Sequence, residues 1–149
     1  MEITMTINAT AKDFYNLILA SCAHDINRST NQNLTPNDIT SGFTYKKNLT
    51  NKIGKTGDST AVIKTVDFPH LYEATFTTRR GINTLSYQIH EESKGKLCIN
   101  YKEVYEPIDK SHALNFKLTN FFYRRSFKKK MTNTITLMEQ HLAKIDKSG

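Results

Sequence analysis

The hydrophobic period changes three times along this chain, and these changes restrict its fold more than any other feature. Between residues 43 and 105, apolar and polar residues alternate as in strands with one buried face. Residues 11–28 and 111–145 instead show the spacing of core-facing helices. Short turns such as Arg80-Gly81 and Ser93-Lys94-Gly95 separate the alternating segments. Because turns this short join antiparallel strands, the sequence predicts an α+β fold built on an antiparallel sheet.

The other expected elements follow from local patterns. A helix is expected over residues 11–28, a loop over 27–33 and a short helix after Thr35-Pro36. The loop before Asp58 leaves room for an irregular seventh strand. Val62, Lys64 and Val66 are expected to share one face of a strand. Six strands are expected, over residues 3–7, 43–49, 62–66, 72–76, 85–89 and 97–105.

The C-terminal helix carries the clearest periodic signal. Its apolar residues are spaced by three or four positions and form one stripe, which consists of Phe127, Met131, Ile135, Met138, Leu142 and Ile145. A curved antiparallel sheet with one apolar face must be covered, and this helix is the expected cover. We therefore expect residues 1–149 to form a single domain, in which a six- or seven-stranded sheet wraps around the C-terminal helix.

Composition excludes several classes of protein. With 149 residues, 38% of them hydrophobic and 23% charged, the chain can build one core, and general disorder is excluded. No apolar run approaches the ~20 residues of a membrane span. Two cysteines are too few for a disulfide framework, which favours the reducing cytoplasm. The five histidines lack metal-ligand spacing, and no phosphate-binding glycine loop is present. The sequence therefore assigns no catalytic residue, metal or cofactor.

The net charge of +7 is concentrated near the C-terminus. Residues 114–149 hold eight Lys or Arg and two Asp or Glu, a net charge of +6. Here Phe121 and Phe122 precede the cations Arg125, Lys128 and Lys129. An apolar patch beside a basic one is typical of a surface that docks on an anionic membrane or a protein partner. The other interpretation is a turn or helix packed on the body, and the sequence leaves a homodimer open.

Three short motifs stand at element boundaries. They are Met1-Glu2-Ile3-Thr4, Leu34-Thr35-Pro36 before Gly42-Phe43-Thr44-Tyr45, and Phe121-Phe122-Tyr123 before Arg124-Arg125-Ser126-Phe127-Lys128-Lys129. With the order of elements, they resemble the START-like or SRPBCC superfamily, which has the helix-grip fold, and within it the bacterial domain of unknown function 3284. The resemblance implies a cytoplasmic protein of Gram-positive bacteria. It also implies a cavity that, elsewhere in the superfamily, holds lipids, sterols, polyketides or other apolar ligands; some members are enzymes and others only bind or transport.

Tyrosines on the apolar side of the alternation suggest a ligand site. Five of the seven lie there, namely Tyr45, Tyr72, Tyr87, Tyr101 and Tyr105. A phenol combines an apolar ring with a polar tip, which suits a pocket for an amphipathic molecule. The alternative is that they are core residues with bonded hydroxyls. Because burial prevents them from stacking on bases, nucleic acid is not an expected partner.

A charged pair is a second candidate feature. Glu103 is in phase with Tyr101 and Tyr105, so its carboxylate is expected on the concave side of the sheet, where it needs a partner. On the C-terminal helix, Asn120 and Arg124 fall within the angular range of the apolar stripe. Arg124 could meet Glu103 there or bind an anionic head group, unless the helix bends and leaves it solvated.

These observations predict non-catalytic binding of a small apolar or amphipathic molecule between the sheet and the C-terminal helix. Docking through segment 114–130 is a second hypothesis. An enzyme that uses Glu103 as an acid or base is a third.

Overall fold

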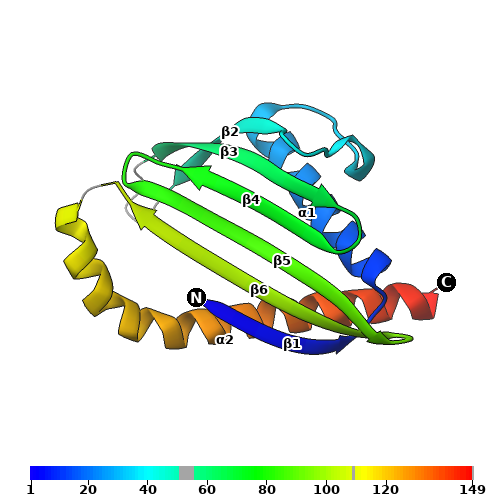
Figure 1. Ribbon diagram of the computed structural model, residues 1–149. Helices are drawn as coiled ribbons and strands as arrows, with labels where there is room; N and C mark the ends of the chain where they lie inside the picture. Colours follow the sequence, from blue (N-terminus) through cyan, green and yellow to red (C-terminus); the bar gives the residue numbers. More distant parts are fainter. Residues whose placement is uncertain (51–55, 109, 149) are drawn as a thin grey trace.

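The computed structural model describes the backbone of residues 1–50, 56–108 and 110–148, and the side chains of residues 1–47, 58–108 and 124–145. The six expected strands and three expected helices are confirmed (Figure 1). In chain order they are β1 (Glu2–Asn8), α1 (Ala11–Thr30), the short 3-10 helix η1 (Pro36–Asp38), β2 (Thr44–Thr50), β3 (Thr56–Asp67), β4 (Leu71–Thr77), β5 (Gly81–Ser93), β6 (Lys96–Pro107) and α2 (Lys110–Ser148). The irregular strand expected near Asp58 is the first part of β3.

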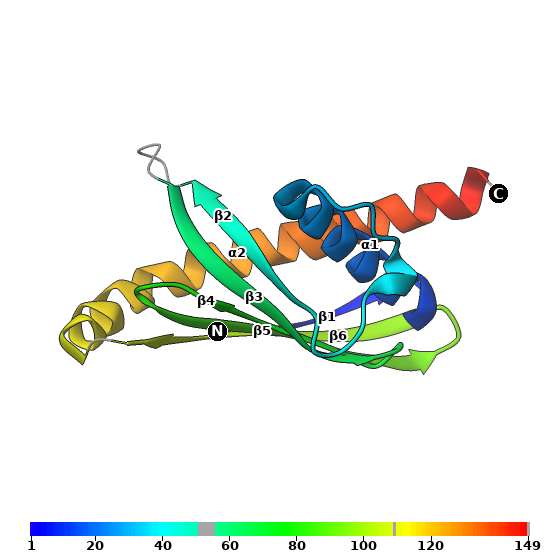
Figure 2. The same ribbon diagram turned by 90° about the horizontal axis from the view of Figure 1, so that it is seen from above.

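The strands form one antiparallel sheet in the order β1-β6-β5-β4-β3-β2. Strands β2 to β6 follow chain order, and β1 adds to the edge opposite β2. Figure 2 shows that the sheet is curved and that α1 and α2 lie on the same side of it. We call the side that faces the helices the inner face and the other side the outer face. This is the helix-grip architecture that the sequence resemblance implied.

Helix α1 is capped by side chains at its N-terminus and ends at a left-handed residue. The hydroxyl of Thr10 accepts a first-turn N–H at 3.2 Å, and the Glu91 carboxylate from β5 accepts another at 2.8 Å. The helix continues to Thr30, so the loop expected over residues 27–33 is wrong in its first part. Asn31 ends the helix with a left-handed φ of 56°, which asparagine tolerates better than most residues.

Strand β3 contains a bulge that the alternation did not reveal. The pairing with β4 shifts register between Ile63 and Thr65, so the inner face changes phase there. Ile63 is buried, whereas Lys64 is exposed. The prediction that Val62, Lys64 and Val66 share one face is therefore wrong.

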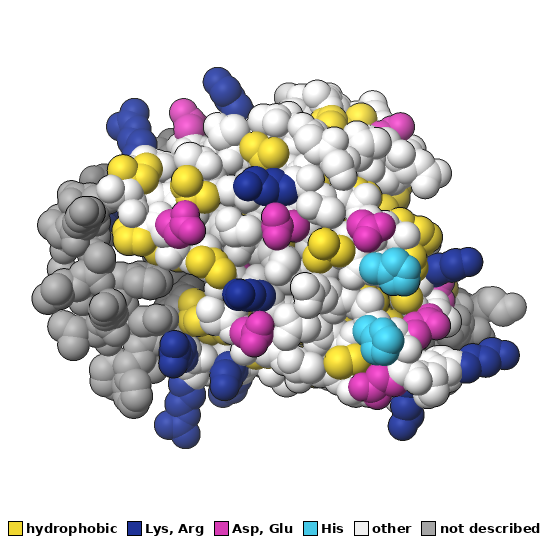
Figure 3. Space-filling view, in the orientation of Figure 1, with side chains coloured by type: hydrophobic (Ala, Val, Ile, Leu, Met, Phe, Trp, Pro, Cys, Tyr) yellow, Lys and Arg dark blue, Asp and Glu magenta, His cyan; other side chains and the backbone are white. Residues whose placement is uncertain are grey.

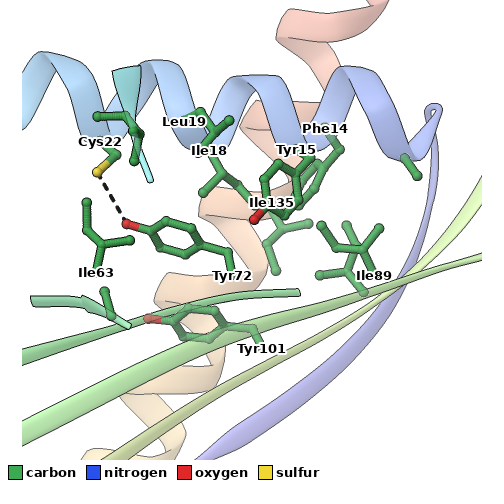
Figure 4. Close-up of a cluster of buried hydrophobic side chains, with 14 of the residues drawn as sticks. Phe14, Tyr15, Ile18, Leu19, Cys22, Ile63, Tyr72, Ile89, Tyr101 and Ile135 are labelled. Carbon is green, nitrogen blue, oxygen red and sulfur yellow. Dashed lines mark hydrogen bonds between the residues drawn. The ribbon is translucent and has the colours of Figure 1, made fainter. Parts of the chain in front are cut away.

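Helix α2 packs on the inner face through its predicted stripe. Ile135 is fully buried, and Figure 4 shows it in one cluster with Ile18 of α1 and Ile89 of β5. The ring of Phe127 stacks on that of Tyr101, with 6.0 Å between their centroids. The expected burial of Ile145 is wrong. This residue is 53% exposed because α2 runs past the end of the sheet (Figure 1). Its other members are buried or half-buried, namely Phe127, Met131, Ile135, Met138 and Leu142.

Candidate functional site

The antiparallel register brings inner-face side chains of neighbouring strands into rows. Three rows cross β4, β5 and β6: Tyr72–Tyr87–Tyr101, Ala74–Leu85–Glu103 and Phe76–Asn83–Tyr105. Tyr45 joins the last row through Ala61, which pairs with both Tyr45 and Phe76. The predicted inward orientation of the five tyrosines is confirmed.

Burial along the inner face decreases from one end of the sheet to the other. Near the β5–β6 turn, Ile89 and Leu97 are buried. At the opposite end, several inner-face residues are only half-buried, among them Glu103 and a group of five, namely Phe76, Asn83, Leu85, Tyr87 and Tyr105. We call these five residues the open end of the inner face. Solvent therefore reaches side chains that the pleat turns towards the helices.

Among the five inward tyrosines, the hydroxyls of Tyr45, Tyr72 and Tyr101 are bonded within the protein. Tyr45 donates to Asp25 Oδ2 at 2.6 Å, Tyr72 donates to Cys22 Sγ at 3.3 Å, and Tyr101 donates to the Glu103 carboxylate. Burial raises the pKa of each of these phenols above its ordinary value, and the accepting group raises it further. These three residues fit the alternative interpretation of tyrosines as core residues with satisfied hydroxyls.

Tyr87 differs from them, since its hydroxyl makes no hydrogen bond to the described part of the chain. Its ring is held between Phe14, at 6.0 Å between centroids, and Tyr101, at 4.7 Å. Burial, and secondly the nearby Glu103 charge, raise the pKa of Tyr87 to about 12. At neutral pH the open end therefore presents a neutral phenol that can donate or accept a hydrogen bond.

The structure does not bring Glu103 and Arg124 together. Glu103 lies on the inner face as predicted, but its carboxylate is engaged by Tyr101. Arg124 is exposed, which corrects its expected inward orientation, and these two described side chains form no ion pair. The physical reason is that Phe127 takes the position above Tyr101, so the covered part of the stripe starts there. The side chain of Asn120 lies outside the described residues.

The cations of the predicted docking segment are exposed on α2. They are Arg125, Lys128 and Lys129, together with Arg124 and Lys130. The side chains of Phe121 and Phe122 lie outside the described residues, so the apolar half of that prediction is not described.

A polar cluster that the sequence did not reveal lies between α1 and the strands β2 and β3. We call it the Lys47 cluster and define it as Asp25, Tyr45, Lys47 and Ser59. Lys47 Nζ lies 3.0 Å from Asp25 Oδ1, while Tyr45 donates to the other carboxylate oxygen. Lys47 pairs in register with Ser59 of β3. Ser59 is 2% exposed, and its hydroxyl has no hydrogen-bond partner among the described residues.

One signal could have indicated this cluster. Lys47 follows Tyr45 by two residues, so the alternation already turns it inward. A lysine at such a position needs a counter-charge, but nothing local in the sequence identifies Asp25 on a distant helix.

A shallow pocket of about 350 Å³ lies on the outer face. Its polar lining includes His70, Gln88, His90, Cys98 and Asn100. Figure 3, which views this side of the sheet, shows histidine side chains near one end. Among the described residues, no three His, Cys, Asp or Glu side chains are placed to hold a metal ion.

Comparison with known proteins defines the family. The family described as a domain of unknown function, DUF3284, matches residues 1–124. The chain belongs to the DUF3284 family. No curated protein matches its sequence. Of the helices that the structure describes, none has the length and apolar character needed to cross a bilayer.

Solved structures show which fold this DUF3284 protein has. A protein of unknown function from Staphylococcus aureus, SA2116, is similar over 100% of this chain and 96% of its own, with a TM-score of 0.61 and 10% identity. Ara h 8.0201 matches over 97% of each chain, also with a TM-score of 0.61 and 10% identity. A conserved protein from Geobacillus kaustophilus matches over 96% and 94%, with a TM-score of 0.55 and 14% identity. At these identities the likeness shows the fold alone, and it confirms the helix-grip fold.

Proposed function

We propose that this DUF3284 protein binds a small apolar or amphipathic molecule against the open end of the inner face. The observation that carries the proposal is the partial exposure of Phe76, Leu85 and Tyr87 on the side of the sheet that the fold turns towards its helices. Covering apolar surface is favourable by roughly 25 cal/mol per Å², so an apolar molecule placed there is stabilised.

The polar groups of this region support the amphipathic part of the proposal. Ligand sites combine a mainly apolar lining with a few polar groups that orient the ligand. The Tyr87 hydroxyl, which has no hydrogen-bond partner in the described part of the chain, is such a group, because its ring is fixed by contacts on two sides and the phenol remains neutral near pH 7.

A matched pair of variants tests the site. Leu85 lies on the inner face, whereas Val104 pairs with the neighbouring Thr84 and is 39% exposed on the outer face. With ethylnaphthalene as an apolar probe, we expect the wild-type protein to bind and Leu85→Trp to weaken binding by about tenfold because indole fills the site. Val104→Trp is expected to bind like the wild type. Ligand-observed NMR measures all three affinities.

Two results would contradict the proposal. The first is no binding of ethylnaphthalene by the wild-type protein, together with no mass above that of the polypeptide when the cell-purified protein is examined by native mass spectrometry. The second is equal loss of binding in both tryptophan variants, which would place the probe elsewhere.

A second candidate function is docking of α2 on an anionic membrane surface. The observation that favours it is the exposure of five cations within residues 124–130. A basic residue close to an anionic leaflet contributes about 1 kcal/mol, so a cluster of this size supports reversible attachment at low salt. Charge reversal in this segment tests the second function.

A further inference from the structure

We propose that the Lys47 cluster recognises an uncharged carbonyl oxygen on the bound molecule, with the Ser59 hydroxyl as hydrogen-bond donor. This inference rests on the proposed function and adds to it the chemical class of the ligand. It predicts an apolar molecule that carries a ketone, ester or amide at one end.

The cluster adjoins the open end through Phe76. Lys47 Nζ lies 5.6 Å from the centroid of the Phe76 ring, and Phe76 is one of the five half-buried residues of that region. Ala61, two residues after Ser59, pairs with Phe76. A molecule whose apolar body covers Phe76 can therefore reach Lys47 and Ser59 with one end.

Lys47 and Ser59 stand next to each other on the inner face. They are directly opposed in the antiparallel pairing of β2 and β3, and side chains in such pairs have Cβ atoms about 5 Å apart. Tyr45 and Lys47 both bond to Asp25 of α1, which confirms that this side of the two strands faces the helix.

The Ser59 hydroxyl is the group that calls for a ligand. Burial of a hydroxyl without a hydrogen bond is unfavourable, and buried polar side chains in proteins are nearly always bonded. Ser59 is only 2% exposed. Among the described side chains, its hydroxyl is the buried polar group that has no hydrogen-bond partner. A ligand oxygen beside it would complete its hydrogen bonding.

The charges of the cluster select the kind of oxygen. Each Asp25 oxygen already accepts from a donor, Lys47 at one and Tyr45 at the other. The opposite charges of Asp25 and Lys47 balance, so the cluster has no net charge to attract an anion. The groups that remain available to a ligand are hydrogen-bond donors, namely the Ser59 hydroxyl and the other ammonium hydrogens of Lys47. Donors without excess charge suit a carbonyl oxygen better than a carboxylate, which would compete with Asp25 for Lys47.

Three naphthalenes of similar shape test this selection: acetylnaphthalene with a ketone, ethylnaphthalene without oxygen, and the anion naphthoate. We expect the wild-type protein to bind the ketone most tightly. Ser59→Ala is expected to weaken ketone binding by about fivefold, the loss of one net hydrogen bond, and to leave ethylnaphthalene binding unchanged. Thr60→Ala, at an exposed position on the same strand, is the matched control and should change neither affinity.

The outcomes separate this inference from the proposed function. If the wild-type protein binds none of the three probes, the proposed function fails and this inference fails with it. If ethylnaphthalene binds but the ketone binds no better, or if Ser59→Ala and Thr60→Ala give the same ketone affinity, the carbonyl site is overturned while the proposed function stands. Preference for naphthoate would show that the site takes an anion and would also overturn the inference.

Discussion

Replacing Ile135 by alanine tests the packing on which the proposed ligand site depends. Ile135 is fully buried, and it lies in the stripe by which α2 covers the inner face (Figure 4). Leu137, two residues later on the same helix, is 63% exposed. Both positions lie on the same helix but differ strongly in burial. Substitution of Ile135 removes contacts with the sheet and α1, whereas substitution of Leu137 removes a side chain that is mostly in solvent.

The expected magnitude follows from what Ile135→Ala deletes. Three buried carbon atoms at about 0.8 kcal/mol each give roughly 2.4 kcal/mol. The cavity left behind adds about 1 kcal/mol, whereas the better helix propensity of alanine returns about 0.4 kcal/mol. We expect the free energy of unfolding to fall by about 3 kcal/mol for Ile135→Ala and by less than about 0.5 kcal/mol for Leu137→Ala.

Urea and thermal unfolding measure this difference. For a chain of this size, 1 kcal/mol corresponds to a change in Tm of about 2–4 °C, so Ile135→Ala should lower Tm by roughly 6–12 °C. Equal losses in the two variants, or a loss below about 1 kcal/mol for Ile135→Ala, would show that α2 does not pack on the inner face through this stripe. The proposed ligand site would then lose its cover.

Three further predictions concern the start of β5, the phenols and the basic surface of α2. Gly81→Ala should lower the free energy of unfolding by about 1–3 kcal/mol, because a Cβ there would lie 2.8 Å from the Tyr105 ring and 2.5 Å from a backbone oxygen; unchanged urea unfolding would refute this contact. The raised pKa of Tyr87 favours the neutral phenol in the fold, so stability that is present up to pH 10 should be lost as pH rises towards 12. Tyr87→Phe should lose less stability over that interval, and identical pH profiles would contradict the assignment. If α2 docks on membranes, salt-sensitive co-sedimentation with anionic vesicles should disappear in Arg125→Glu with Lys129→Glu; no retention of the wild-type protein at low salt would reject docking.

Most of the fold could be predicted from the sequence alone, because the spacing of apolar residues reflects which side of each element is buried. Positions on one face recur every two residues in a strand and every 3.6 residues in a helix, whichever element packs on that face. The six strands, both long helices and the inward tyrosines could therefore be predicted. The errors arose where a local irregularity interrupted the spacing of apolar residues. The bulge after Ile63 changed the phase of β3, and Asn31 moved the end of α1 beyond the expected boundary.

The candidate site depended on the tertiary structure. Alternation turned Glu103 inward and already placed Tyr101, two residues before it on the same strand, beside its carboxylate. Lys47 was turned inward in the same way, but its partner Asp25 lies on another element and was decided by packing. Hydrogen bonds act over about 3 Å, and groups on separate elements reach that distance only when those elements have docked.

For the same reason the Ser59 hydroxyl, which has no partner among the described residues and on which the carbonyl site depends, could be recognised only in the folded chain. The face on which it lies also became clear only there, because the bulge after Ile63 puts Val62 and Val66 on opposite faces, against the alternation expected from the sequence.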